Sequence, residues 1–202
     1  CREVLALRIP EFRAVLLGDS EEPFPEELRS EAIRKLRGVR ILDPACGGGA
    51  FLVGMRRVLR EVHRSLETEE EIGNLYGVDL DPQAAAVTRM RWWLEGGSGR
   101  MGGKSAEVLA ANIAAGDSIA DGTEGPGDRK WDIIVTNPPY GVKASFRDRD
   151  RIMGASSNGH RSRDSYGLFL ARVPDMLAED GAAGRIQPGP GDRPGHRILR
   201  GR

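Results

Sequence analysis

The sequence Asn137-Pro-Pro-Tyr140 carries the most specific chemistry in this chain. A side-chain amide oxygen and a backbone carbonyl are both acceptors, and side by side they match the two hydrogens of a planar exocyclic amino group. The two prolines stiffen the turn and remove competing N–H donors, and Tyr140 supplies a ring on which a planar base can stack. The pattern predicts a site that holds and activates the amino group of a base. The alternative is a rigid surface turn with a buried tyrosine.

A glycine-rich segment at residues 43–52, DPACGGGAFL, predicts a ligand-binding loop. It joins an expected strand to an expected helix, and glycines at such a place let the backbone approach a ligand that faces the helix N-terminus. Leu52 stands where a dinucleotide fingerprint has its third glycine, which disfavours close packing of the NAD type. We therefore expect a nucleoside or nucleotide site, with a tight turn that binds nothing as the alternative.

Acidic residues follow two other expected strands. Asp79 closes the second strand, where a carboxylate can accept hydrogen bonds from both hydroxyls of a ribose. Asp81 is better explained as a helix cap. Asp117, in Gly-Asp-Ser, could accept a hydrogen bond from an adenine amine, although its simplest interpretation is a turn residue.

These residues need a scaffold of alternating strands and helices. Apolar segments bounded by turn residues predict strands at 39–43, 75–79, 112–115 and 132–136. Apolar residues at three- and four-residue intervals predict helices at 51–66, 82–94 and 166–177. Strands that alternate with helices form a parallel sheet, so we expect an α/β fold with a helical lead-in at residues 1–37.

Four ordered motifs resemble those of the S-adenosylmethionine-dependent adenine-specific DNA methyltransferases. They lie at residues 43–52, at 75–82 running into RWWL at 91–94, at 112–119 (NIAAGDSI) and at 137–143 (NPPYGVK). The likeness is to the methylase region of fused type II restriction-modification or phage-defence enzymes. In those enzymes a helix follows these motifs, and residues 164–169 (DSYGLF) resemble it. It implies a Rossmann-like methyltransferase domain over residues 38–187, with a doubly wound, mainly parallel sheet, that methylates the exocyclic amine of adenine in DNA.

The same resemblance implies roles for single residues. It assigns S-adenosylmethionine binding to Asp43, Ala45, Gly47, Gly49, Asp79, Leu80, Asp117 and Ser118. Among these, Asp43 and the glycines would surround the methionine end of the cofactor, Asp79 its ribose and Asp117 its adenine. Asn137, Pro138 and Tyr140 would be the catalytic residues, which bind an adenine flipped out of double-stranded DNA.

The chain departs from the family pattern in three places. Gly47-Gly48-Gly49 replaces the usual Gly-Ser-Gly, and no aromatic-rich segment of the kind that often precedes the first motif is recognisable in residues 1–37. After residue 187 the family continues into further strands and a target-recognition domain, whereas residues 188–202 are rich in Gly, Pro and Arg. We expect this tail to be disordered, without strand or helix. Together with Cys1 in place of Met, it predicts a fragment or a frameshifted, C-terminally truncated methyltransferase domain.

Composition limits the partners. Thirty Lys+Arg balance thirty Asp+Glu, so any DNA contact must be local. No apolar run approaches the ~20 residues of a membrane helix, and two cysteines without a signal peptide predict a cytoplasmic protein. His63, His160 and His196 lie far apart, with no Cys or acid at ligand spacing, so we expect no metal site.

Two other functions remain open at this stage. The same chemistry could act on a protein glutamine amide or on RNA, although the RWWL and DSYGLF likenesses favour DNA. A second alternative is a non-catalytic remnant that at most binds the cofactor.

Overall fold

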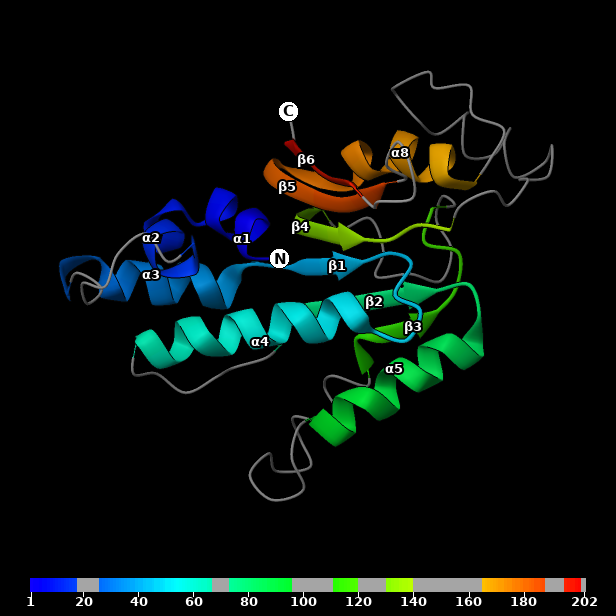
Figure 1. The fold of residues 1–202 in the computed structure, drawn as a ribbon, viewed down its shortest axis with the longest axis horizontal. Helices are drawn as coiled ribbons and strands as arrows, with labels where there is room; N and C mark the ends of the chain where they lie inside the picture. The colour runs from blue at the N-terminus through cyan, green and yellow to red at the C-terminus, as the bar shows by residue number, and fades with distance from the viewer. Residues whose placement is uncertain are drawn as a thin grey trace.

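The computed structural model describes residues 1–17, 26–66, 73–95, 111–119, 130–139, 165–187 and 195–200. Within these residues a six-stranded sheet has the order β3-β2-β1-β4-β5-β6 (Figure 1). Its strands are β1 (Ile41–Asp43), β2 (Leu75–Asp79), β3 (Ile113–Ala115), β4 (Trp131–Thr136), β5 (Leu177–Gln187) and β6 (Gly195–Arg200). Strands β1 to β5 are parallel to one another, and β6 is antiparallel to β5. Because the strand order reverses at β1, the sheet is doubly wound, as the sequence predicts.

The helices alternate with the strands. They are α1 (Arg2–Arg8), the short 3-10 helix η1 (Pro10–Phe12), α2 (Arg13–Leu17), α3 (Glu26–Gly38), α4 (Ala50–Ser65), α5 (Pro82–Glu95) and α8 (Ser165–Met176). Within residues 1–37 the described elements are all helical, and α4, α5 and α8 begin and end within one residue of their predicted bounds. None of the helices in the described ranges has the length and apolar character that a membrane crossing requires.

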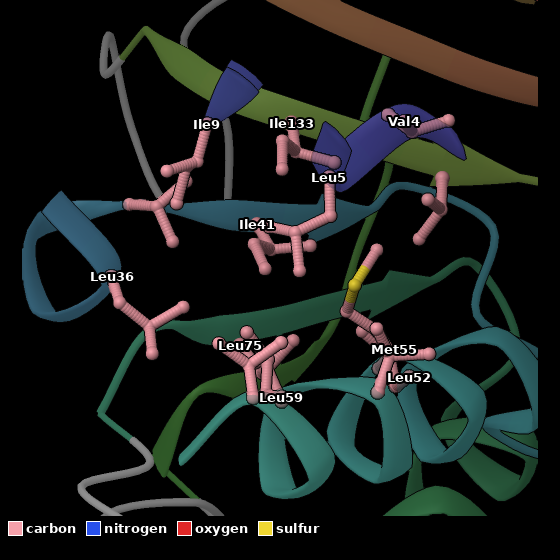
Figure 2. Close-up of a cluster of buried hydrophobic side chains, with 14 of the residues drawn as sticks. Val4, Leu5, Ile9, Leu36, Ile41, Leu52, Met55, Leu59, Leu75 and Ile133 are labelled. Carbon is pink, nitrogen blue, oxygen red and sulfur yellow. The ribbon is translucent and has the colours of Figure 1, made fainter. Parts of the chain in front are cut away.

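One face of the sheet is covered by α4 and α5 and the other by α8 (Figure 1). On the first face, Ile41 of β1 and Ile133 of β4 belong to one cluster with Leu5 of α1 and with Leu52 and Met55 on the apolar side of α4 (Figure 2). These side chains are fully buried, and each stabilises the fold by about 1.5–3 kcal/mol. The three- and four-residue spacing of apolar residues in α4 thus holds this helix against β2 and β4.

The alternate residues of the same strands form a second cluster. Leu42 and Ile134, which are register partners in β1 and β4, pack with Val173 of α8. The central strands are therefore buried on both faces, as is typical of parallel sheets under helices. This double burial fixes the direction of β1 and β4, and with it the place where their carboxyl ends emerge.

Asp132 links the amino end of β4 to Arg8 of α1 and to Arg40 before β1. Its carboxylate accepts hydrogen bonds from Arg8 Nη2 at 3.0 Å and from the Arg40 amide at 2.9 Å. A cavity of about 320 Å³ beside it is lined by Arg8, Lys35 and neighbouring residues. Because Asp132 is the second residue of β4 and Arg40 directly precedes β1, this cavity lies at the amino ends of the strands, away from the motifs that carry chemistry.

The expectation that residues 188–202 contain no strand is wrong for residues 195–200. This segment forms β6, with Ile198 paired to Gly184 of β5. The segment has no proline, so each of its amides can serve as a donor. Backbone hydrogen bonds to the edge strand of an existing sheet can form a strand without the run of apolar residues by which a strand is recognised in a sequence.

Candidate functional site

The predicted cofactor residues come together at the carboxyl edge of β1, β2 and β3. The amide of Gly47, in the loop after β1, donates to Asp79 Oδ2 at 2.7 Å. The hydroxyl of Ser118, in the segment after β3, donates to the carbonyl oxygen of Pro44. Three segments far apart in the sequence are thus joined by direct hydrogen bonds at one edge, where open α/β sheets bind their ligands.

Two glycines of the loop have left-handed backbone conformations, with φ of 51° at Gly47 and 78° at Gly49. A Cβ at Gly49 would lie 2.9 Å from Cγ2 of Thr88 in α5, whereas a Cβ at Gly47 would meet no atom within 4 Å. Thr88 also donates from Oγ1 to the Gly47 carbonyl at 2.6 Å. Packing and conformation both require glycine at Gly49, while open space beside Gly47 lets another group approach the backbone.

Asp79 is held in place at the end of β2. Besides accepting from Gly47, it accepts through Oδ1 from the amide of Asp81 at 2.9 Å. Asp81 in turn accepts from the amide of Gln83 at 2.9 Å, which confirms its predicted role as the cap of α5. Leu80 is 76% exposed, so an apolar side chain lies open to solvent next to the fixed carboxylate.

Asp43 is the most buried carboxyl at this edge, with an exposed fraction of 1%. Burial raises its pKa to about 7, and the negative charge of Asp79 adds to the increase. The Ala45 amide, which donates to Asp43 Oδ1 at 3.2 Å, and the Thr136 hydroxyl lower the pKa in part. Asp43 Oδ2 and Thr136 Oγ1 nevertheless do not reach hydrogen-bonding geometry with each other or with other described residues. The carboxyl therefore keeps its proton to a much higher pH than an exposed aspartate does.

The segment after β3 has the turn character that its sequence suggests. Asp117 Oδ1 accepts from the amide of Ile119 at 3.2 Å, which closes a local turn. Ile119 packs with Leu168 and Phe169 of α8, and Ala45 of the glycine loop lies against this cluster. Asp117 thus stands beside the loop of β1.

The Asn137 turn leaves the sheet at β4, the direct neighbour of β1. Asn137 is exposed and Pro138 is buried, so the asparagine stands at the surface on a fixed backbone. The carbonyl of Pro139 accepts from Ser165 Oγ at 2.9 Å, which ties the turn to the first residue of α8. Tyr140 lies outside the described residues, and its stacking role stays a prediction.

Two buried threonines belong to this site although the sequence argument did not select them. Thr88 supports the glycine loop, and Thr136 lies against Asp43. Thr88 could have been found from its spacing with Ala85 and Trp92, which gives it a place on the buried side of α5. Thr136 is a polar residue in a strand buried along its whole length, directly before the Asn137 turn.

Comparison with known proteins gives one family and a consistent group of relatives. The family model described as N-6 DNA Methylase matches residues 26–189. The type II methyltransferase M.VspI of Vibrio sp. (strain 343) is 28% identical over 142 residues, which cover 70% of this chain and 29% of that protein. The type I restriction enzyme MjaIX methylase subunit of Methanocaldococcus jannaschii is 31% identical over 105 residues, 52% of this chain and 16% of that subunit. The match thus spans less than a third of either relative.

Solved structures share the fold. The crystal structure of the M protein of type I restriction enzyme EcoKI has a TM-score of 0.54 at 19% identity and covers 88% of this chain and 37% of that one. The type IIL restriction-modification enzyme MmeI, in complex with DNA, has a TM-score of 0.53 at 20% identity, with 91% and 29% covered. These likenesses confirm the Rossmann-like methyltransferase fold.

Proposed function

Because the chain belongs to the N-6 DNA methylase family, we propose that it transfers a methyl group from S-adenosylmethionine to the exocyclic amine of adenine in DNA. One observation carries this proposal. The glycine loop and the Asn137 turn leave the sheet from β1 and β4, which are paired side by side through Ile41 with Ile133 and Leu42 with Ile134. A methyl donor at the loop and an amine at the turn would therefore meet at the carboxyl ends of these two strands.

The residues after β1 and β2 suit S-adenosylmethionine. Asp79 offers a fixed carboxylate for the ribose hydroxyls, and the exposed Leu80 offers an apolar surface for the adenine ring. Gly47 leaves open space beside the backbone, and Asp43 has a buried oxygen without a partner among the described residues. When bound, the cofactor supplies a methyl group on a sulfonium, whose C–S electron pair returns to sulfur as the new bond to nitrogen forms.

Asn137 is proposed to prepare the acceptor nitrogen. In adenine the lone pair of this nitrogen is conjugated with the ring, which makes it a poor nucleophile. The Asn137 side-chain oxygen and the Pro138 carbonyl would accept the two N–H hydrogens and hold them out of the ring plane, which restores the lone pair. An amine held in this way would be aligned to accept the methyl group and would release one proton to solvent.

The proposed partner is double-stranded DNA. An adenine in a duplex must leave the base stack to reach such a turn, at a cost of a few kcal/mol. With no net charge on the chain, DNA must be held by local contacts. We propose that the reaction serves restriction-modification in the cytoplasm, and that a target-recognition domain outside these 202 residues selects the site.

Product analysis tests this function. The chain is incubated with methyl-labelled S-adenosylmethionine and DNA of mixed sequence, and the DNA is digested to nucleosides. We expect the label in N6-methyladenine. Label in an added RNA or in protein glutamine would show that the acceptor is not DNA. Cofactor binding with no labelled product would support the non-catalytic alternative.

A further inference from the structure

Two buried side chains at the candidate site leave adjacent oxygens without partners. Asp43 ends β1 and Thr136 ends β4, and both are at least 98% buried. Asp43 Oδ1 accepts from the Ala45 amide, but Asp43 Oδ2 and Thr136 Oγ1 make no hydrogen bond within the described ranges. Buried polar atoms are normally paired, so these two oxygens mark a place for a third polar group.

The charges around Asp43 indicate what that group is. Asp79 faces it from β2 and is negative, and Cys46 faces it from the glycine loop as a neutral thiol, because burial raises the pKa of that thiol to about 12. Thr136 faces it from β4 and carries no charge. Among the described residues, the groups that shift the pKa of Asp43 include no Lys, Arg or His. A group with a positive charge and several hydrogens complements these surroundings.

We propose that Thr136 is a positioning residue that, with Asp43, receives the ammonium group at the methionine end of S-adenosylmethionine. The inference rests on the proposed function and adds a residue to it. An ammonium has three hydrogens, enough to donate to Asp43 Oδ2 and Thr136 Oγ1 together. Because Asn137 follows Thr136 directly, the same contact would join the cofactor to the turn that holds the target base.

Binding of the ammonium should change the protonation of the Asp43 carboxyl. In the free protein, burial keeps the pKa of Asp43 at about 7, so a large fraction of the carboxyl is neutral at that pH. A cation beside the carboxyl favours the ionised form, and binding therefore releases a proton to solvent. The Thr136 hydroxyl lowers the same pKa, so its loss would move the proton release to higher pH.

Two ligands isolate the amino acid end of the cofactor, which carries the ammonium. S-adenosylhomocysteine carries the amino acid end, whereas 5′-methylthioadenosine has the same nucleoside and thioether without it. Both are titrated calorimetrically into the wild-type chain and into Thr136→Val, which keeps the side-chain shape and removes the hydroxyl. We expect Thr136→Val to weaken S-adenosylhomocysteine about tenfold or more, as for a hydrogen bond to a charged group, and 5′-methylthioadenosine less than about twofold. Thr136→Ser should restore most of the lost affinity.

Thr88→Val is the matched control, because it removes another buried threonine hydroxyl at the same loop. It acts through the Gly47 backbone and not on Asp43, so it should leave the pH of proton release as in the wild type. Calorimetry in buffers of different ionisation enthalpy then counts released protons. We expect release near pH 7 in the wild type, release at higher pH in Thr136→Val and none in Asp43→Asn.

The outcomes distinguish a failure of the proposed function from a failure of the role given to Thr136. If a folded wild-type chain binds neither ligand, the proposed function itself fails. If both ligands bind the wild type and Thr136→Val weakens them equally, Thr136 only supports the fold and the inference is overturned. Normal binding of S-adenosylhomocysteine to Thr136→Val would overturn it as well, with water filling the space between the two oxygens.

Discussion

Asp79 Oδ2 lies 2.7 Å from the Gly47 amide nitrogen, so the end of β2 fixes the glycine loop that follows β1. The second carboxylate oxygen is held by the Asp81 amide at 2.9 Å. With both oxygens restrained, the carboxylate stays at the edge where a ribose is proposed to bind. A preformed acceptor of this kind loses little side-chain freedom when a ligand arrives.

Asp79→Asn should weaken cofactor binding strongly. The substitution keeps the shape of the side chain but removes the charge that strengthens hydrogen bonds from ribose hydroxyls, each worth about 1.5–3 kcal/mol. Calorimetric titration with S-adenosylmethionine measures the loss, which we expect to exceed about tenfold. Asp81→Asn is the matched control, because Asn caps a helix as well as Asp does. An equal loss in both variants would contradict the assignment of Asp79.

Gly49→Ala should destabilise the protein more than Gly47→Ala. Both substitutions place a side chain in the left-handed region, which costs about 1 kcal/mol. At Gly49 the new Cβ also meets Thr88 at 2.9 Å, and overpacking of this kind adds about 1–3 kcal/mol, whereas the space at Gly47 is open. Urea denaturation compares the two unfolding free energies. Equal values would show that the loop can shift away from Thr88.

Asp43→Asn should change how stability depends on pH. Because the folded state raises the pKa of Asp43 from 3.8 to about 7, the folded protein holds this proton more tightly than the unfolded chain. This contribution to stability is complete below the unfolded pKa and is lost as pH rises to about 7, with a slope near 1.4 kcal/mol per pH unit. In Asp43→Asn the loss is absent.

The measurement is the difference in unfolding free energy between wild type and Asp43→Asn, taken at intervals from pH 4 to 8. We expect the variant to gain on the wild type as pH rises, up to about pH 7, and to keep a constant advantage above it. A difference that does not vary with pH would mean that the Asp43 carboxyl is not desolvated in the folded protein.

Several features of the fold could be predicted because one local signal decides each of them. The apolar spacing of residues 51–66 and Pro82 behind Asp81 set the bounds of α4 and α5 within one residue. Residues 195–200 carry no such local signal for β6, because the strand depends on pairing with the backbone of β5. Edge pairing depends on backbone groups, which a search for apolar runs does not detect.

The motifs of the candidate site could be predicted from the sequence, whereas the buried threonine that contacts Asp43 could not. Asp79 and Gly47 could be paired in advance, since both follow strands of one parallel sheet. Nothing in the sequence reports that Thr136 lies against Asp43, because that contact depends on how far β1 and β4 extend past their last register pair. The role of Tyr140 stays a prediction from sequence.

The central claim is that Asn137 acts on the target amine and not on the cofactor. Its most direct test is Asn137→Ala in the full chain, with single-turnover methyl transfer to DNA measured at saturating S-adenosylmethionine and cofactor affinity measured beside it. Asn137→Asp, which keeps an acceptor oxygen, is the matched control. We predict that Asn137→Ala lowers the transfer rate by ~10²–10³, as for loss of one positioned polar group at a reacting centre, with cofactor affinity unchanged. Lost cofactor binding with an intact rate at saturation would place Asn137 in the cofactor site and contradict the proposed mechanism.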